Sequence, residues 1–295
     1  MLLPISTRAI FPTLSLAARE ERSITLRAKA MAKDFQLIHI TVDEERLSKA
    51  NNRLRNQFVG CMHAHNELTM LNRLLMFTMN DTGDGELHDS ARSVQMWFML
   101  QLLAAKLFET WVMLNERFLQ SNPPDVVGRL EPAQEASLKW LIEYFGSGQP
   151  FKDSALKIIR DKTAFHYDRI NLAEAAANLA AGENSLYLAQ HPANSLYYMG
   201  SALVFRAAFA MIADEAAGAA NGSHEERVHR GTNIALDHAS KANWHMHTLL
   251  YGLIRLLIDD VRGQPAENEQ QVRINVVDAP APERVGIPVF IDIGP

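Results

Sequence analysis

The sequence predicts an all-α protein, a multi-helix bundle of long antiparallel helices followed by an irregular C-terminal tail. Two observations predict this fold class. Apolar residues recur at helical intervals through most of residues 41–262. The breaks between these stretches are rich in Gly and Pro, which end helices, as in NDTGDGE, SNPPDVVG and GSGQP.

The helices are expected in the following order. The first begins at Thr41, which stands at capping-box spacing from Glu44, and runs to about residue 80. The next helices span about 90–120, 132–146 with Pro132 in the first turn, a stretch holding IIRDKTAFHYD (158–168), a short helix from Leu172 capped by Asn171, about 194–217 and about 224–261.

The chain divides into three parts. Residues 1–30 form a leader that contains Arg, Ser and Thr and no acid before Glu20, as in an organelle transit peptide. We favour the alternative that the natural start is Met31, because the leader has no clear cleavage signature. Residues 31–263 form the helical domain. Residues 264–295 form a Pro-containing tail, in which VRINVV and IPVFIDI alternate as strands do and suggest one short hairpin.

Composition excludes several classes of protein. A net charge of −5 excludes a bulk polycation, so nucleic acid would have to bind at a local patch. The single cysteine, Cys61, cannot form an internal disulfide, which fits the reducing cytoplasm. The longest uncharged stretch, 184–205, is broken by Asn, Gln, His and Pro. We therefore expect a cytoplasmic protein that does not span a membrane.

The histidines do not combine into a metal site. His224 and His229 in HEERVH are five residues apart, which leaves them roughly 140° apart around a helix. His63 and Glu67 are four residues apart, a spacing more typical of a surface pair. The sequence also contains no Gly-rich phosphate loop and no nucleophile elbow. We therefore expect neither a metal nor a cofactor.

The stretch IIRDKTAFHYD places two polar side chains in an apolar context. On a regular helix His166 lies near the middle of an apolar arc, and Arg160 lies at its edge, roughly 120° away. In an arbitrary protein the ordinary explanation would be a core histidine bonded to a backbone carbonyl and a rim arginine in a salt bridge.

The order Arg160, Asp161, KTAF, His166 offers a second explanation. An Arg, a polar residue, four to six further residues and a His, set in a helix of an all-helical domain, resembles the motif of the HEPN superfamily (higher eukaryotes and prokaryotes nucleotide-binding domain). The similarity is to its bacterial abortive-infection and toxin members. It covers residues 158–168 in sequence and, over about 41–262, only the order and length of the helices.

The resemblance implies a HEPN-type bundle and a metal-independent endoribonuclease. His166 would be its general acid or base, and Arg160 would hold the scissile phosphate. Asp161 would orient Arg160, with Lys162, Tyr167 and Asp168 as supporting residues. Some HEPN toxins carry His-x-Tyr with a tyrosine that a partner modifies. Tyr167 directly follows His166, so that role is not carried over.

The resemblance also implies partners: RNA as substrate, an antitoxin protein and a second copy of the chain. Because Arg160 and His166 diverge on a regular helix, either the helix kinks between them or Arg160 of one chain meets His166 of another in a homodimer. We favour the dimer. Two other functions stay open: a non-catalytic HEPN-like module that binds RNA, a nucleotide or a protein, and a structural helical protein.

Overall fold

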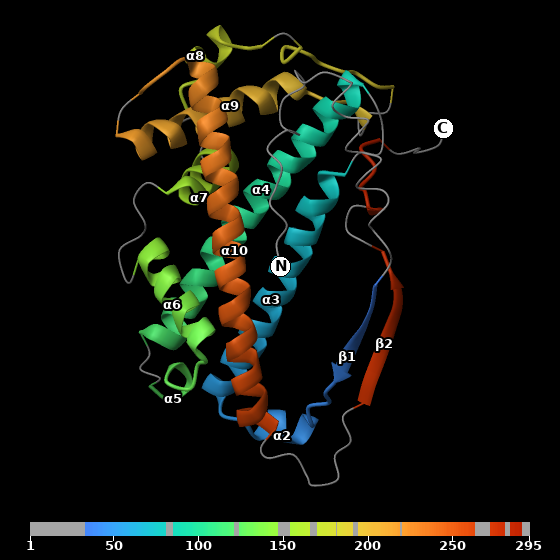
Figure 1. Ribbon diagram of the computed structural model, residues 1–295, viewed down its shortest axis with the longest axis vertical. Helices are drawn as coiled ribbons and strands as arrows, with labels where there is room; N and C mark the ends of the chain where they lie inside the picture. The colour runs from blue at the N-terminus through green and yellow to red at the C-terminus, as the bar shows by residue number, and fades with distance from the viewer. Residues whose placement is uncertain are drawn as a thin grey trace.

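The computed structural model describes residues 33–80, 85–120, 124–146, 154–165, 170–180, 182–190, 194–218, 220–262, 272–280 and 284–290. Most of them are helical, which confirms the all-α prediction (Figure 1). The leader 1–30 lies outside the described residues. In chain order the elements are β1 (Lys33–His39), α2 (Glu44–Lys49), α3 (Asn52–Thr78), α4 (Glu86–Leu114), the π-helix η2 (Asn115–Leu119), α5 (Pro124–Val127), α6 (Pro132–Phe145), α7 (Ala155–Ile158), the π-helix η3 (Ile159–Phe165), α8 (Leu172–Ala177), α9 (Tyr198–Ala217), α10 (His224–Arg262) and β2 (Val272–Ala279).

Three long helices form the body of the bundle. Helix α3 runs antiparallel to α4, and α10 lies alongside both (Figure 1). Leu68 of α3, Leu107 of α4 and Leu250 of α10 are fully buried where these helices pack. Burying a leucine side chain contributes about 1.5–3 kcal/mol, so this seam supplies much of the stability of the fold.

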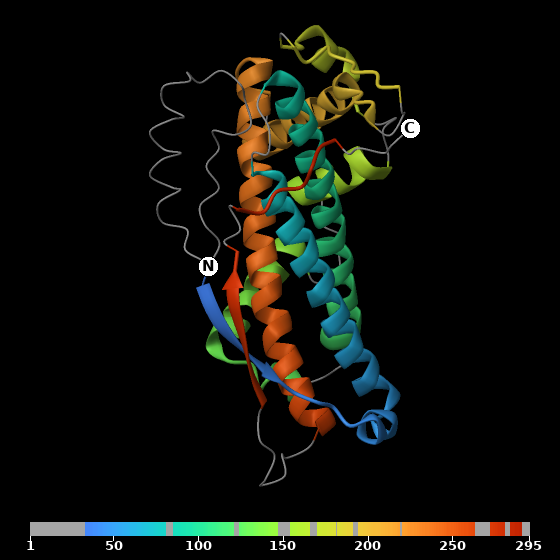
Figure 2. The same ribbon diagram turned by 90° about the vertical axis from the view of Figure 1, so that its right-hand side faces the viewer.

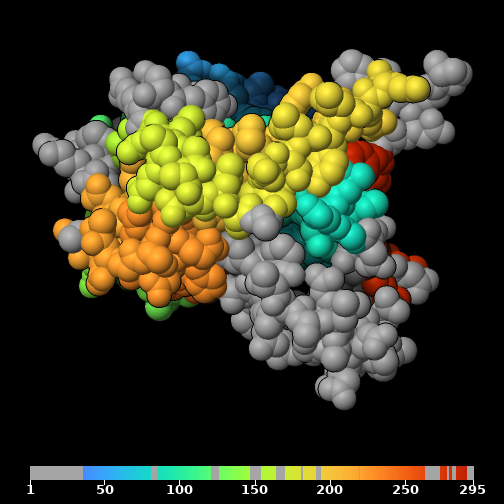
Figure 3. All heavy atoms as spheres, turned by 90° about the horizontal axis from the view of Figure 1, so that it is seen from above, coloured from blue at the N-terminus to red at the C-terminus, as the bar shows by residue number. Residues whose placement is uncertain are grey.

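Helix α9 crosses the bundle at one end and packs against α10 there (Figures 1 and 2). Helix α8 packs against α9, and viewed from that end it lies beside the start of α10 (Figure 3). Helix α6 packs on α10 nearer the other end. The motif segment, α7 and η3, contacts α4, α9 and α10.

The first predicted helix is two helices. Helix α2 ends at Lys49, and α3 begins after Asn51, whose side chain accepts a hydrogen bond from the Leu54 amide at 2.8 Å. The cap of α2 is Asp43, whose carboxylate accepts from the Glu45 amide, so the expected Thr41 capping box was wrong. Asn caps a new helix as readily as Ser or Thr.

Helix ends elsewhere follow the sequence more closely. Helix α6 begins at Pro132 and ends before Gly146, as predicted, and a capping box of Glu131 and Gln134 closes its first turn. Asn171 caps α8, accepting from the Ala173 amide at 3.1 Å. Helix α9 starts at Tyr198, four residues later than expected.

The predicted strand VRINVV is present, but its partner is not the one expected. β2 pairs antiparallel with β1 from the other end of the domain, with Leu37 opposite Ile274. In the expected partner, IPVFIDI (287–293), residues 287–290 form no strand, and residues 291–293 lie outside the described residues. The tail instead lies along the bundle: Asn80 donates to the Val285 carbonyl, and Gln95 donates to the Pro288 carbonyl at 3.1 Å.

Among the described residues, the span Glu86–Leu119 is long and apolar enough to cross a membrane by length and composition, a feature that the sequence analysis did not identify. Inside the protein 44% of its apolar window is buried. Leu100, Leu103 and Leu107 from this span stand at the centre of the core.

Candidate functional site

The motif segment begins as a regular helix and then widens. Ser154 caps α7 by accepting a hydrogen bond from the Lys157 amide at 3.1 Å. From Ile159 to Phe165 the chain is a π-helix, in which each amide bonds to the carbonyl five residues back. Such turns are rare and occur frequently at functional sites. Arg160 and Asp161 lie inside this turn.

Side-chain bonds support the π-helical turn. The Thr163 hydroxyl donates to the Ile159 carbonyl at 2.6 Å. From α4, the Gln101 amide donates to the Thr163 carbonyl at 3.2 Å. The first bond lies within the turn and the second links the turn to α4, so the backbone that carries Arg160 is held in place.

The Arg160 guanidinium lies against α4. Its central carbon is 4.1 Å from the centroid of the Phe108 ring, within range of a cation–π interaction. Nη2 donates to the Glu109 carboxylate at 3.2 Å, and Nη1 donates to the Asp161 carboxylate at 3.1 Å. The side chain is 25% exposed, so Arg160 is the rim arginine that its helical position predicted. Asp161 also pairs with Lys157 at 3.0 Å.

The structure thus places the side chains of Arg160 and Asp161 in contact. Lys162 follows them on the same turn and is half-buried. His166, Tyr167 and Asp168 lie outside the described residues. The predicted divergence of Arg160 and His166 assumes a regular α-helix, whereas the chain from Ile159 to Phe165 is a π-helix.

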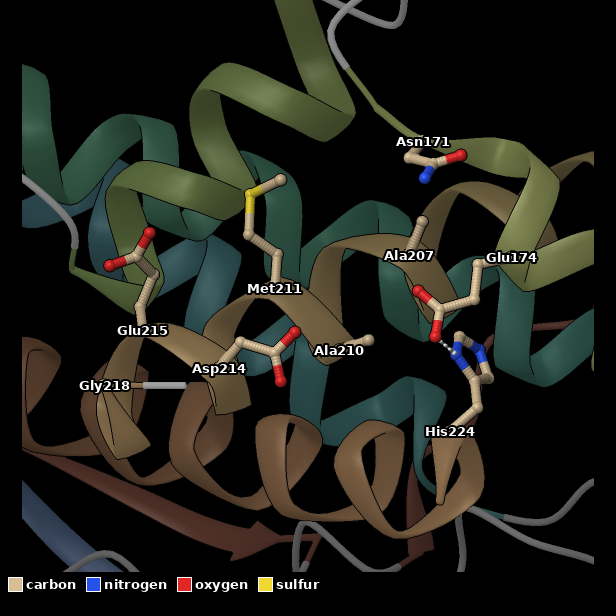
Figure 4. A pocket seen from close by; sticks show the side chains of 9 residues that line it. All are labelled: Asn171, Glu174, Ala207, Ala210, Met211, Asp214, Glu215, Gly218 and His224. Atoms are coloured by element: carbon tan, nitrogen blue, oxygen red, sulfur yellow. Dashed lines mark ion pairs between the residues drawn. The ribbon is translucent and has the colours of Figure 1, made fainter. Parts of the chain in front are cut away.

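A second cluster of polar groups lies between α8, α9 and the start of α10. Arg227, only 8% exposed in its side chain, pairs with Asp214 at 2.8 Å and with Glu174. Glu174 and Asp214 border a cavity of about 440 Å³ (Figure 4), whose lining is Asn171, Glu174, Ala207, Ala210, Met211, Asp214, Glu215, Gly218 and His224. The sequence analysis considered His224 only as a metal ligand and did not identify this cavity, because nothing local in HEERVH signals burial.

A buried arginine anchors the neighbouring turn. Arg206 of α9 is 3% exposed and donates to Glu183 at 3.0 Å, to Glu225 at 2.6 Å and to the Asn178 carbonyl at 3.0 Å. These contacts tie the segment after α8 to the first turn of α10.

Several other histidines of the described residues are in structural contacts. His63 and Glu67 form the expected i, i+4 pair at 3.3 Å. His238 lies 3.1 Å from the Tyr144 hydroxyl, and His245 stacks on Trp140 with centroids 4.4 Å apart. Burial lowers the pKa of both rings. Within the described ranges, no three His, Cys, Asp or Glu side chains are placed to hold a metal ion.

No family model, curated protein or solved structure matches this chain.

Proposed function

We propose that this protein is a metal-independent endoribonuclease of the defence or toxin type, with Arg160 and His166 as its catalytic pair. The observation that carries the proposal is the setting of Arg160. Its guanidinium is partly exposed, lies on an aromatic ring and is oriented by Asp161, on a π-helical turn whose last residue, Phe165, directly precedes His166.

The chemistry suits these residue types. The 2′-OH of RNA supplies the nucleophile, so the reaction needs no metal-activated water. A histidine can take the 2′-OH proton or give one to the leaving 5′-oxygen. A guanidinium presents a planar fork of donors that matches phosphate oxygens and offsets charge developing on them. Lys162 adds a second cation on the same turn.

A second candidate function is a non-catalytic module that binds RNA, a nucleotide or a protein partner. The observation in its favour is that two carboxylates, Glu109 and Asp161, already pair with Arg160, so the guanidinium has contacts that require no catalytic role. In either function, an RNA phosphate that binds Arg160 must replace at least one of these carboxylates. Glu109 is the one to leave, because its side chain is 58% exposed, whereas that of Asp161 is 23% exposed.

The test is RNA cleavage by the purified protein. We expect cleavage to continue in EDTA, to leave a 2′,3′-cyclic phosphate, and to stop when the nucleotide at the cut carries 2′-deoxyribose. His166→Asn keeps the size and polarity of the side chain and removes its acid–base capacity, so cleavage should vanish while the thermal midpoint stays close to that of the wild type. RNA binding without cleavage by the wild type would favour the second candidate.

The assembly of the site needs its own experiment, because the helix is not regular between the two residues. Arg160→Ala and His166→Ala chains are refolded together, and heterodimers are confirmed by mass. Partial recovery of cleavage supports a site shared across a homodimer. Heterodimers without any activity support a site within one chain.

A further inference from the structure

The turn between α9 and α10 contains an asparagine followed by a glycine, Asn221 and Gly222. It lies at the end of the bundle where α9 crosses (Figure 1). Both residues are exposed, and neither belongs to a helix or a strand. No other Asn-Gly pair occurs in the sequence. Because glycine has no Cβ, its amide nitrogen is open to approach the side chain of the preceding asparagine.

The start of α10 requires glycine at this position. Gly222 has a φ of +92°, which side chains other than that of glycine rarely allow, and a Cβ there would lie 2.7 Å from Glu226 Oε2. The same carboxylate oxygen accepts from the Ser223 amide at 2.8 Å and from the Ser223 hydroxyl at 3.1 Å, as in a capping box. The fold therefore keeps, next to Asn221, the residue type that leaves its side chain most open to attack.

A cation contacts the peptide group that joins the two residues. Arg230 Nη2 donates to the Asn221 carbonyl oxygen at 2.6 Å. That oxygen and the Gly222 nitrogen share one conjugated peptide group, so the negative charge left when the nitrogen loses its proton spreads onto the oxygen. A charged donor at the oxygen stabilises this anion. Within the described part of the chain, neither the Asn221 side chain nor the Gly222 amide forms a hydrogen bond, so both are available to react.

We propose that Asn221 deamidates spontaneously in the folded protein and that Arg230 assists the reaction. Solvent hydroxide takes the Gly222 amide proton, and the nitrogen forms a bond to Asn221 Cγ. The side-chain nitrogen takes a proton from water and leaves as ammonia, which closes a cyclic imide. Water then opens the imide at either carbonyl, giving aspartate or isoaspartate, so the chain exchanges an amide for a carboxylate and gains one negative charge. The reaction uses neither Arg160 nor His166, so it stands apart from the ribonuclease proposal.

Incubation of the folded full chain in water labelled with heavy oxygen, at mildly alkaline pH, tests the proposal. Opening of the imide places one oxygen from water in the new carboxylate, so the label marks conversion during the incubation and not during later digestion in ordinary water. Trypsin releases residues 207–227, in which Asn221 is the only asparagine. We expect mass spectrometry to find the label at Asn221, in both aspartate and isoaspartate. Label in the urea-unfolded chain but not in the folded chain would overturn the proposal, because the fold would then protect Asn221.

Variants test the part played by Arg230. Arg230→Gln removes the charged donor and should slow conversion of the folded protein about threefold or more. The difference from the wild type should vanish in urea, where the contact is lost. Arg255→Gln, at an exposed arginine further along α10, is the matched control, with the wild-type rate expected.

Arg230→Lys keeps the charge without the planar fork of donors, so its rate should lie between those of the wild type and Arg230→Gln. A folded Arg230→Gln chain that converts as fast as Arg255→Gln would show that Arg230 does not assist. If Arg230→Gln does not fold, the comparison of Arg230→Lys with Arg255→Gln decides: a slower rate supports the assistance, and an equal rate overturns it.

Discussion

The imidazole ring of His65 on α3 meets that of His247 on α10 edge to face, with ring centroids 4.8 Å apart. The contact lies where the two long helices pack. Burial lowers the pKa of His65, and burial together with the nearby His65 lowers the pKa of His247 to about 4. Both rings are therefore held in the neutral form in the folded protein at neutral pH.

This pair predicts a loss of stability on acidification. As pH falls below 6.5, the unfolded chain takes up protons on these histidines before the folded chain does. The stabilisation is complete above pH 6.5 and is lost toward pH 4. Allowing for the partial exposure of the ring, His247 accounts for about 2 kcal/mol of that loss. Burial also lowers the pKa of His238 and His245, which adds to the loss in the same direction.

Urea unfolding at a series of pH values measures this effect. His247→Gln, which does not titrate, should flatten the decline in unfolding free energy between pH 6.5 and 4. Asn66→Ala, an exposed neutral position on α3, should retain the wild-type slope. A slope in His247→Gln as steep as in the wild type would show that this ring does not contribute.

Replacement by alanine should change the unfolding free energy differently at three glycines, because a Cβ at each would meet different neighbours. A Cβ at Gly231 would lie 1.8 Å from the Phe209 carbonyl oxygen, where α9 and α10 touch, and backbone cannot give way. Gly231→Ala should therefore cost about 3 kcal/mol or more of unfolding free energy. A Cβ at Gly252 would meet the Gln134 side chain, 2.3 Å from its Cδ. That side chain can move but gives up its capping box, so Gly252→Ala should cost about 1–2 kcal/mol.

Gly200 is the matched control for both. It lies in the first turn of α9, and a Cβ there would meet nothing within 4 Å. Gly200→Ala should stabilise the protein by about 0.5–1 kcal/mol, because alanine favours the helix. Denaturant midpoints of the three variants give the order; a wild-type midpoint for Gly231→Ala would show that α9 and α10 do not approach so closely.

Removing the charge of Arg206 should lower the unfolding free energy, because Arg206 is buried and pairs with Glu183 and Glu225. Arg206→Met keeps the length of the side chain but leaves Glu183, 13% exposed, without its cation. We expect a loss of about 3 kcal/mol in unfolding free energy. The double variant Arg206→Met/Glu183→Gln removes the stranded charge and should recover part of the loss. Equal stability of the single and double variants would mean that Glu183 gains little from Arg206.

Local signals predicted those elements that local chemistry determines. Pro132 and Gly146 bound α6, and Asn171 caps α8, because these residues act on the backbone within one turn. The break before α3 was missed because the apolar pattern continues through it while Asn51 starts a new helix. The partner of β2 could not be predicted, since β1 is more than two hundred residues away in the chain and many strands would satisfy the same alternation.

In the candidate sites, too, the position of Arg160 could be predicted from local sequence, whereas the surroundings of His224 could not. Arg160 was predicted at the rim of an apolar arc, and its contacts with Glu109 and Asp161 are those of a rim arginine. The π-helix around it has no sequence signal comparable to a cap. The buried setting of His224 arises from the docking of α8 and α9 on α10, which sequence periodicity does not specify.

The pairing of Glu109 with Arg160 leads to a prediction that separates a working site from a structural salt bridge. Glu109→Gln removes a carboxylate that competes with phosphate for the guanidinium and leaves Phe108 and Asp161 to orient it. If Arg160 binds the scissile phosphate, RNA affinity should rise about threefold to tenfold. The salt dependence of binding should also become steeper, because the Arg160 guanidinium, without Glu109, neutralises an RNA phosphate and releases the counterions bound to it. Glu116→Gln, a charge change on the adjoining η2, is the control and should leave affinity close to the wild-type value. If Arg160 is only structural, Glu109→Gln leaves RNA affinity at the level of this control and lowers unfolding free energy by about 0.2–1 kcal/mol, as for other exposed ion pairs.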